Sequence, residues 1–257
     1  MGYNSPVVSL ALAATFLACP LHPVSLDVEL GQRALPGLPP DLARQLAKHP
    51  GAFAQGAKAA ASYPAPLHQR GGRNGVEAAI LAQCDRLVQA IRSRSSFEAI
   101  TAGFGALAHL VLDFSFPASR AAESQALSAF LASRLPRIPV VFYAGAEELP
   151  FASREKLWGF LLAERQRLPS LEQALLEDFA RVGGPSAWNS LDDRSTTFGV
   201  ASVAFNRATS QFVTVSAWVW HHAGGLVPRF PGDGQRILVW KGALQPREAP
   251  VPRLGVR

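Results

Sequence analysis

The chain has 257 residues, of which 48% are apolar and 17% charged, which is enough apolar material for one sizeable buried core and too much for low-complexity disorder. The formal net charge is +6, only four of the 25 basic residues are lysines, and no basic cluster or specific nucleic-acid motif occurs. The two cysteines, Cys19 and Cys84, belong to no CxxC or CxxH pair, which excludes a zinc finger held by thiolates.

The N-terminal segment contains an apolar run, residues 7–19, that is too short to cross a bilayer as a helix. Its length is that of the apolar region of an export signal, although residues 1–6 lack the usual Lys or Arg. Three interpretations are open: cleavage near Ala18, lipidation of Cys19 as the first residue of a bacterial lipoprotein, or an ordinary first helix. We expect export, with residues 1–18 as the signal.

The first half of the mature chain predicts helices separated by one loop. The break at residues 35–40 (LPGLPP) precedes Asp41, which opens a helix. The Ala/Gly-rich residues 51–61 are typical of a tightly packed helix, and residues 62–74 carry prolines and a glycine pair that predict a loop. An amphipathic helix follows over residues 76–91, where apolar residues recur three or four positions apart.

The second half is dominated by apolar helices. Residues 97–114 (FEAITAGFGALAHLVLDF) are apolar on every face, which is typical of a helix at the centre of a bundle. Further helices are expected at about residues 119–135, 152–167 and 170–182. A long helix is expected over residues 195–222, where apolar residues form a continuous seam. The sequence therefore predicts an all-α, multi-helix bundle around one central buried helix.

The C-terminal segment, residues 226–257, is rich in Pro and Gly and contains one short strand-like run at residues 237–240. We expect an irregular tail that lies over the surface. The chain accordingly divides into an export signal (1–18), a helical domain (19–225) and this tail.

One pair of ionisable side chains lies in the central helix. Within residues 99–114 only His109 and Asp113 can ionise, and their spacing of four places them one turn apart on the same face. Burying such groups costs free energy unless they are paired or bound to a metal ion. Two interpretations are open: the pair contributes to a zinc site, or a hydrogen bond between the two satisfies both without a metal.

The loop YPAPLHQRGGR contains a second candidate ligand, His68, whose neighbouring prolines could hold it rigidly. Arg70 and Arg73 follow it, and guanidinium groups beside a metal ion suit a phosphate ester. The alternative is that all three are solvated loop side chains. The sequence contains no nucleophile elbow, P-loop, dinucleotide-binding glycine pattern or HExxH motif.

The order of these features resembles the zinc-dependent phospholipase C and single-strand nuclease superfamily, whose members are exported, all-helical hydrolases with a cluster of zinc ions. His22 stands where that family has a histidine near its mature N-terminus, and His68 stands where it has a loop histidine. His109-Leu-Val-Leu-Asp113 matches the HxxxD motif on its buried helix. The segment 198–225 is similar to the final core helix of the family.

The resemblance covers about residues 20–225, with three departures. The acid expected after Gly56-Ala57 is absent, because residues 58–62 read KAAAS. The histidine expected just past Pro117 is missing, and no HxxxE occurs in residues 120–160. The resemblance therefore implies at most one zinc ion, with these candidate ligands: His22, His68, His109 and Asp113.

Two functions follow from these patterns. The first is an exported hydrolase of phosphate esters or lipids, in which zinc lowers the pKa of a water molecule and Asp113 is a ligand. Arg70 and Arg73 would then hold the phosphate. The second is a non-catalytic envelope or binding protein on the same scaffold. A membrane anchor through Cys19 is compatible with both.

Overall fold

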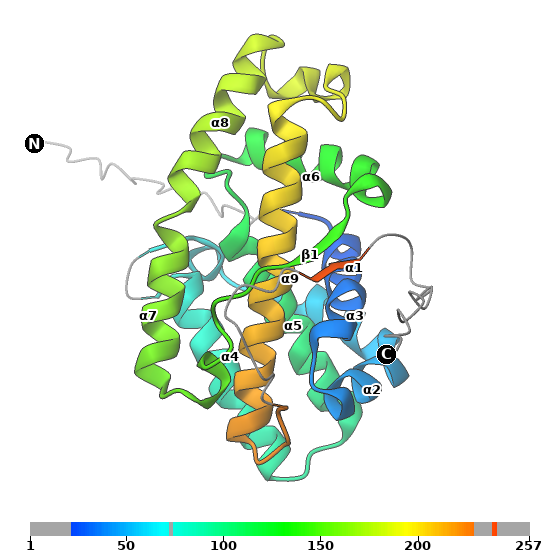
Figure 1. The fold of residues 1–257 in the computed structure, drawn as a ribbon, viewed down its shortest axis with the longest axis vertical. Helices are drawn as coiled ribbons and strands as arrows, with labels where there is room; N and C mark the ends of the chain where they lie inside the picture. Colours follow the sequence, from blue (N-terminus) through cyan, green and yellow to red (C-terminus); the bar gives the residue numbers. More distant parts are fainter. Residues whose placement is uncertain (1–21, 72–73, 229–237, 241–257) are drawn as a thin grey trace, which may run out of the picture.

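The computed structural model describes residues 22–71, 74–228 and 238–240 (Figure 1). Its α-helices are α1 (Val24–Ala34), α2 (Pro40–Lys48), α3 (Pro50–Ala60), α4 (Val76–Arg92), α5 (Phe97–Ser115), α6 (Ala121–Arg134), α7 (Arg154–Arg165), α8 (Leu168–Arg181) and α9 (Thr196–His222). Short 3-10 helices connect them: η1 (Leu35–Gly37), η2 (Ala65–His68), η3 (Leu135–Arg137), η4 (Leu149–Phe151) and η5 (Pro185–Ser190). The predicted all-α bundle is confirmed.

Helix α5 lies at the centre of the bundle, as its sequence predicts. Ser96 caps its first turn by accepting a hydrogen bond from the backbone of Ala99, and its side chains are buried continuously from Phe104 to Ser115. By length and composition α5 could cross a membrane, but 72% of its most apolar window is buried inside the bundle, among α3, α4 and α9. That is the position of a core helix.

Helices α3 and α5 touch backbone to backbone. A Cβ atom at Gly56 would lie 1.8 Å from the carbonyl oxygen of Ala102, and one at Gly105 would lie 1.9 Å from that of Phe53. Only glycine fits at both positions, which is why the Ala/Gly-rich segment forms a tightly packed helix. This contact fixes the distance between α5 and the chain that leads into η2.

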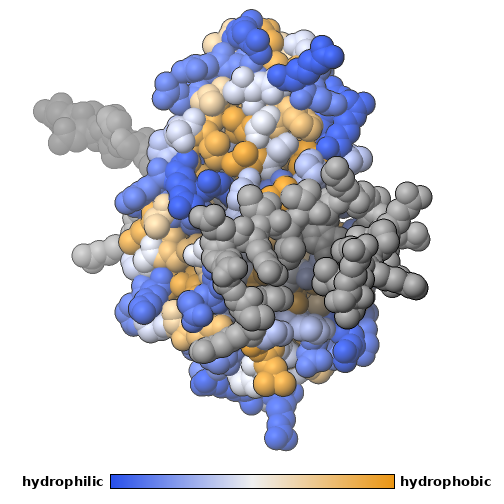
Figure 2. Space-filling view, viewed as in Figure 1, coloured by the Kyte–Doolittle hydropathy of each residue, from blue (hydrophilic) through white to orange (hydrophobic). Residues whose placement is uncertain are grey.

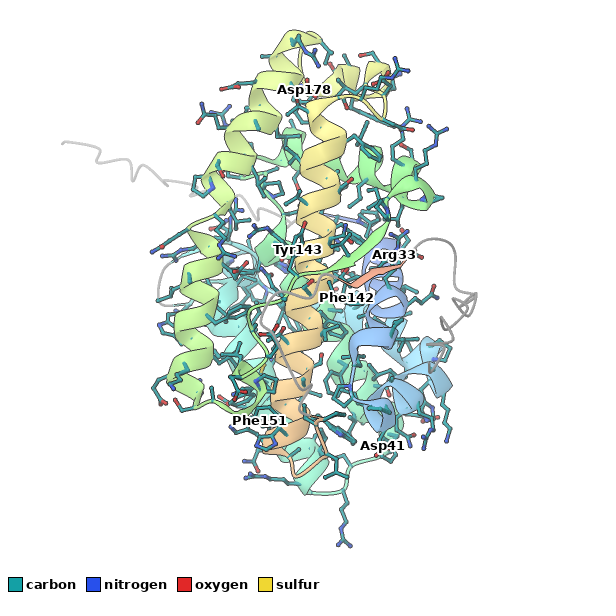
Figure 3. All side chains as sticks on the ribbon, in the orientation of Figure 1. Arg33, Asp41, Phe142, Tyr143, Phe151 and Asp178 are labelled. Carbon is teal, nitrogen blue, oxygen red and sulfur yellow. The ribbon has the colours of Figure 1, made fainter. Side chains whose placement is uncertain are left out.

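Helix α9, drawn in yellow and orange, runs along most of the length of the molecule (Figure 1). It packs against α5, α8, α1 and α4. At its N-terminus the hydroxyl of Ser195 accepts a hydrogen bond from the backbone of Phe198. Asp178, labelled near the upper end of Figure 3, accepts two more from the backbone and hydroxyl of Thr197. These acceptors satisfy amides that the helix itself leaves unpaired.

A two-stranded antiparallel sheet, β1 (Val140–Phe142) with β2 (Leu238–Trp240), crosses α9. The side chains of Asn206 and Ser210 on α9 accept hydrogen bonds from the backbone of Val141 and Tyr143. The strand-like run at residues 237–240 thus contains a true strand, whereas β1 was not predicted. The rest of the predicted tail after residue 228 lies outside the described residues.

Figure 2 shows hydrophilic residues around the rim of one face and a patch of apolar residues in its upper half, over the region of α8 and α9. The buried polar side chains described next form no part of this surface, since they belong to the interior beside α5.

Candidate metal centre

Five ionisable side chains meet beside α5, from three separate parts of the chain. His109 and Asp113 lie on α5, His68 ends η2, and His22 and Asp27 come from the start of α1. All are buried, with these exposed fractions: His22 2%, Asp27 0%, His68 6%, His109 0% and Asp113 1%. The structure therefore brings together all four ligands that the sequence proposed and adds Asp27.

The carboxylate of Asp113 lies at the middle of the group and faces three imidazoles. Its Oδ1 atom is 3.2 Å from His22 Nε2. Its Oδ2 atom is 2.5 Å from His68 Nδ1 and 3.3 Å from His109 Nε2. The contact between His109 and Asp113, four positions apart on α5, is therefore one of several contacts within a larger cluster.

The carboxylate of Asp27 lies on the other side of two of these rings. Its Oδ2 atom is 3.0 Å from His109 Nδ1, and its Oδ1 atom is 3.5 Å from His22 Nδ1. Sequence reasoning missed Asp27, because an acidic residue in the first turn of a helix is ordinary there. The one available signal is its position five residues after His22.

A hydrogen bond to a backbone carbonyl oxygen orients the ring of His68. The Nε2 atom of His68 is 3.1 Å from the carbonyl oxygen of Tyr63, which can only accept, so Nε2 carries a proton. The Nδ1 atom of His68 is thereby turned toward Asp113. Such an outer partner is the usual support of a histidine that binds a metal ion.

Four buried atoms of the cluster lie within ion-pair distance of a partner but make no hydrogen bond among the described residues, namely His22 Nε2, Asp27 Oδ1, His109 Nε2 and Asp113 Oδ1. Two ligand atoms of one tetrahedral zinc ion lie roughly 3.4 Å apart, since each is about 2.1 Å from the metal. The separations of 3.2 and 3.3 Å around Asp113 fit this spacing, whereas His68 Nδ1 and Asp113 Oδ2, 2.5 Å apart, would have to separate for both to bind the ion.

The same residues form two overlapping groups of three that could hold a metal ion. One consists of His22, Asp27 and His109, and the other of His68, His109 and Asp113. Within each group the ligand atoms all lie within 4.8 Å of one another. The buried cluster could thus hold a metal ion, with imidazole nitrogens and carboxylate oxygens as the donors.

The charges within the cluster are strongly coupled. Burial alone would lower the pKa of His22, but the carboxylates of Asp27 and Asp113 outweigh it and raise that pKa to about 9. Burial would also lower the pKa of His68, and its contacts with Asp113 raise it instead. Burial would raise the pKa of Asp113, yet its contacts with His22 and His68 lower it. In the metal-free protein, protonated histidine therefore balances the Asp113 carboxylate.

The loop after His68 is anchored beside the cluster. The backbone of Gly71 donates to the buried carboxylate of Glu77, which also pairs with Arg165 at 3.0 Å. Arg70, predicted to hold a phosphate, donates to the carbonyl oxygen of Phe116 at 2.6 Å and lies 3.9 Å from Glu172. These contacts hold the loop against α4, α8 and the end of α5.

Two predicted site residues, Arg73 and Cys19, lie outside the described residues. Two cavities in the described part of the chain lie away from the cluster. One, of about 330 Å³, is lined by Arg154 and Trp158, and another, of about 290 Å³, by Leu149 and Phe160. None of the five clustered side chains lines either of them.

No protein-family model matches the chain, and no curated protein matches it. The inference about its function accordingly depends on the residues and on their geometry.

Proposed function

We propose that this chain is a zinc-binding protein that holds one ion at the buried cluster. The supporting observation is that buried imidazole and carboxylate atoms form two groups of three that overlap at His109, each of which could hold a metal ion. Imidazole nitrogen suits zinc better than magnesium or calcium, which prefer oxygen ligands. The proposed ligands are His22, His68, His109 and Asp113.

The burial of the ligands favours a non-catalytic role for this ion. Structural zinc sites are closed by protein ligands, whereas catalytic sites keep one position open. His22, His109 and Asp113 are at most 2% exposed, and His68 is 6% exposed. An ion here would tie α1, η2 and α5 together and replace the protons that now balance Asp113. We therefore place the non-catalytic binding protein first.

Hydrolysis of phosphate esters is the second candidate, and one observation favours it. The ligand set consists of histidine and carboxylate without cysteine, as in catalytic zinc sites. A zinc ion supplies Lewis acidity that polarises a phosphoryl oxygen and activates water. His68 would hold the ion at the edge of the cluster that lies nearest the surface loop. Arg70 would have to break its hydrogen bond to the carbonyl oxygen of Phe116 before it could bind a phosphate. We base the proposed resemblance to the phospholipase C and nuclease superfamily on these same candidate ligands.

Metal analysis tests the proposal. We expect about one equivalent of zinc per chain in the purified protein, lost in His109→Ala and retained in Asp178→Asn, a matched change of a buried carboxylate outside the cluster. The absence of zinc after titration of the wild-type protein would refute the proposal. Turnover of a chromogenic phosphodiester by the zinc-loaded wild type, but not by His109→Ala, would move hydrolysis to first place.

We also propose that the protein is exported, on the strength of the apolar run at residues 7–19. Growth with a labelled fatty acid tests the lipid anchor. Label in the wild type that disappears in Cys19→Ser supports lipidation, whereas an unlabelled, exported protein supports cleavage near Ala18.

A further inference from the structure

Asp27 is fully buried and is held in place from both sides. It lies in the first turn of α1 between side chains that belong to the core, since its neighbours Leu26 and Leu30 are at most 1% exposed. Helix α1 packs against α3, α5 and α9. The carboxylate of Asp27 therefore cannot turn to solvent, and it stays directed at His109 and His22.

We propose that Asp27 is a positioning residue that sets the orientation of the metal-binding His109, an inference that rests on the proposed zinc site. A carboxylate only accepts, so the contact of 3.0 Å requires a proton on His109 Nδ1. The lone pair available to a metal ion is then on Nε2, which faces Asp113 at 3.3 Å. Asp27 thus determines which ring nitrogen of His109 binds the ion.

The same carboxylate lies near His22 without a hydrogen bond to it. Its Oδ1 atom is 3.5 Å from His22 Nδ1, which contacts the carbonyl oxygen of Pro23 at 3.5 Å, while His22 Nε2 faces Asp113 at 3.2 Å. The two rings are neighbours, with centroids 4.7 Å apart. The hydrogen bond from Asp27 therefore orients His109, and its charge acts on the neighbouring ring of His22. His68 receives the equivalent support from the carbonyl of Tyr63 instead.

Asp27 also belongs to one of the two groups that could hold an ion, with His22 and His109, but its contact with His109 Nδ1 favours the positioning role. The two nitrogens of an imidazole lie on different edges of the ring, so an ion bound by His109 Nε2 lies away from Asp27, which contacts Nδ1. Outer carboxylates of this kind raise the basicity of the histidine and typically change metal affinity by roughly 10–100-fold.

Zinc titrations of the whole chain test the assignment with two substitutions. We expect Asp27→Ala to raise the Kd for zinc by roughly 10–100-fold. Asp27→Asn should keep part of the affinity that Asp27→Ala loses, because the amide oxygen can still accept a hydrogen bond from His109. The visible spectrum of the cobalt-loaded protein should change in Asp27→Ala, because reorientation of a ligand ring alters the ligand field. Asp178→Asn is the control, and its Kd and spectrum should match the wild type.

Two results would overturn the assignment. Wild-type affinity and an unchanged cobalt spectrum in Asp27→Ala would show that Asp27 only packs. Complete loss of zinc in both Asp27→Ala and Asp27→Asn, as in His109→Ala, would make Asp27 a ligand. A wild-type protein that binds no zinc is a separate outcome, which refutes the zinc site itself and the role of Asp27 with it.

Discussion

Two buried aspartates lie in different parts of this molecule, and their surroundings differ in kind. Asp178, at the junction of α8 and α9, is 3% exposed, and its oxygens accept from the backbone and hydroxyl of Thr197 and from Arg181. Asp113, on α5, is 1% exposed and faces three imidazoles, and its Oδ1 atom has no hydrogen-bond partner in the described part of the chain.

The comparison shows that burial alone does not distinguish a structural carboxylate from a candidate ligand. The partners of Asp178 are fixed donors that cannot give up their protons near neutral pH. The partners of Asp113 are histidines, each of which can exchange a proton for a metal ion. The matching of donors to acceptors, rather than burial, therefore separates the two sites.

Removal of the central carboxylate should have the largest effect. We expect Asp113→Ala to weaken zinc binding by more than the roughly 100-fold typical of losing an outer partner, because a ligand itself is lost. Isothermal titration with zinc measures this, and Asp178→Ala is the control with unchanged affinity. Equal affinities of Asp113→Ala and the wild type would place the ion elsewhere.

Zinc should stabilise the fold through the cluster. At a free zinc concentration of about 1,000 times Kd, the free energy of unfolding should rise by about 4 kcal/mol, provided that the unfolded chain does not bind. Thermal unfolding with zinc and with a chelator measures the difference. This zinc-dependent increase in the free energy of unfolding should persist in Asp178→Asn and vanish in His109→Ala. If zinc still stabilises His109→Ala, the proposed ligands are wrong.

The metal-free protein should lose stability as the pH rises. Because the folded pKa of His22 is raised from 6.5 to about 9, its contribution is complete below pH 6.5 and disappears as the pH passes through 9. The loss should amount to at most about 3 kcal/mol. Urea unfolding in a chelator at pH 6, 7.5 and 9 measures it, and His22→Gln should flatten the profile. A wild-type profile as flat as that of His22→Gln would argue against a protonated His22.

Substitution of Asp178 should have the smallest effect, and it should change the free energy of unfolding but not zinc binding. Asp178→Ala removes an acceptor from the first turn of α9, and loss of such a cap typically costs about 1–2 kcal/mol. Chemical denaturation gives the change in the free energy of unfolding, with Ser195→Ala as a second cap variant. Any accompanying change in zinc affinity would show that the two aspartates are not independent.

The periodic features of the sequence predict most of the fold. Helices α4, α5 and α9 follow from apolar spacing, and the shared face of His109 and Asp113 follows from helix geometry. Strand β1 could not be predicted, because its hydrogen bonds come from side chains of α9 and from a strand almost 100 residues later.

The candidate centre was only partly predictable for a related reason. Local spacing cannot show that residues 22, 68 and 109 meet, and only the family resemblance suggested it. Asp27 has no local signal that separates it from a helix-capping acid, because its partner His109 lies 82 positions away in the sequence. Long-range packing, rather than any motif, therefore completes the cluster.

The contact between Gly56 and Ala102 has a consequence for how this protein can diverge. Where two helices touch through their backbones, their separation is set by atomic radii and not by the volumes of intervening side chains. Substitutions elsewhere in the core can then accumulate while α3 and α5 keep their spacing. The histidine and carboxylate positions would be inherited through that spacing, even in descendants whose remaining sequence shares little with this one.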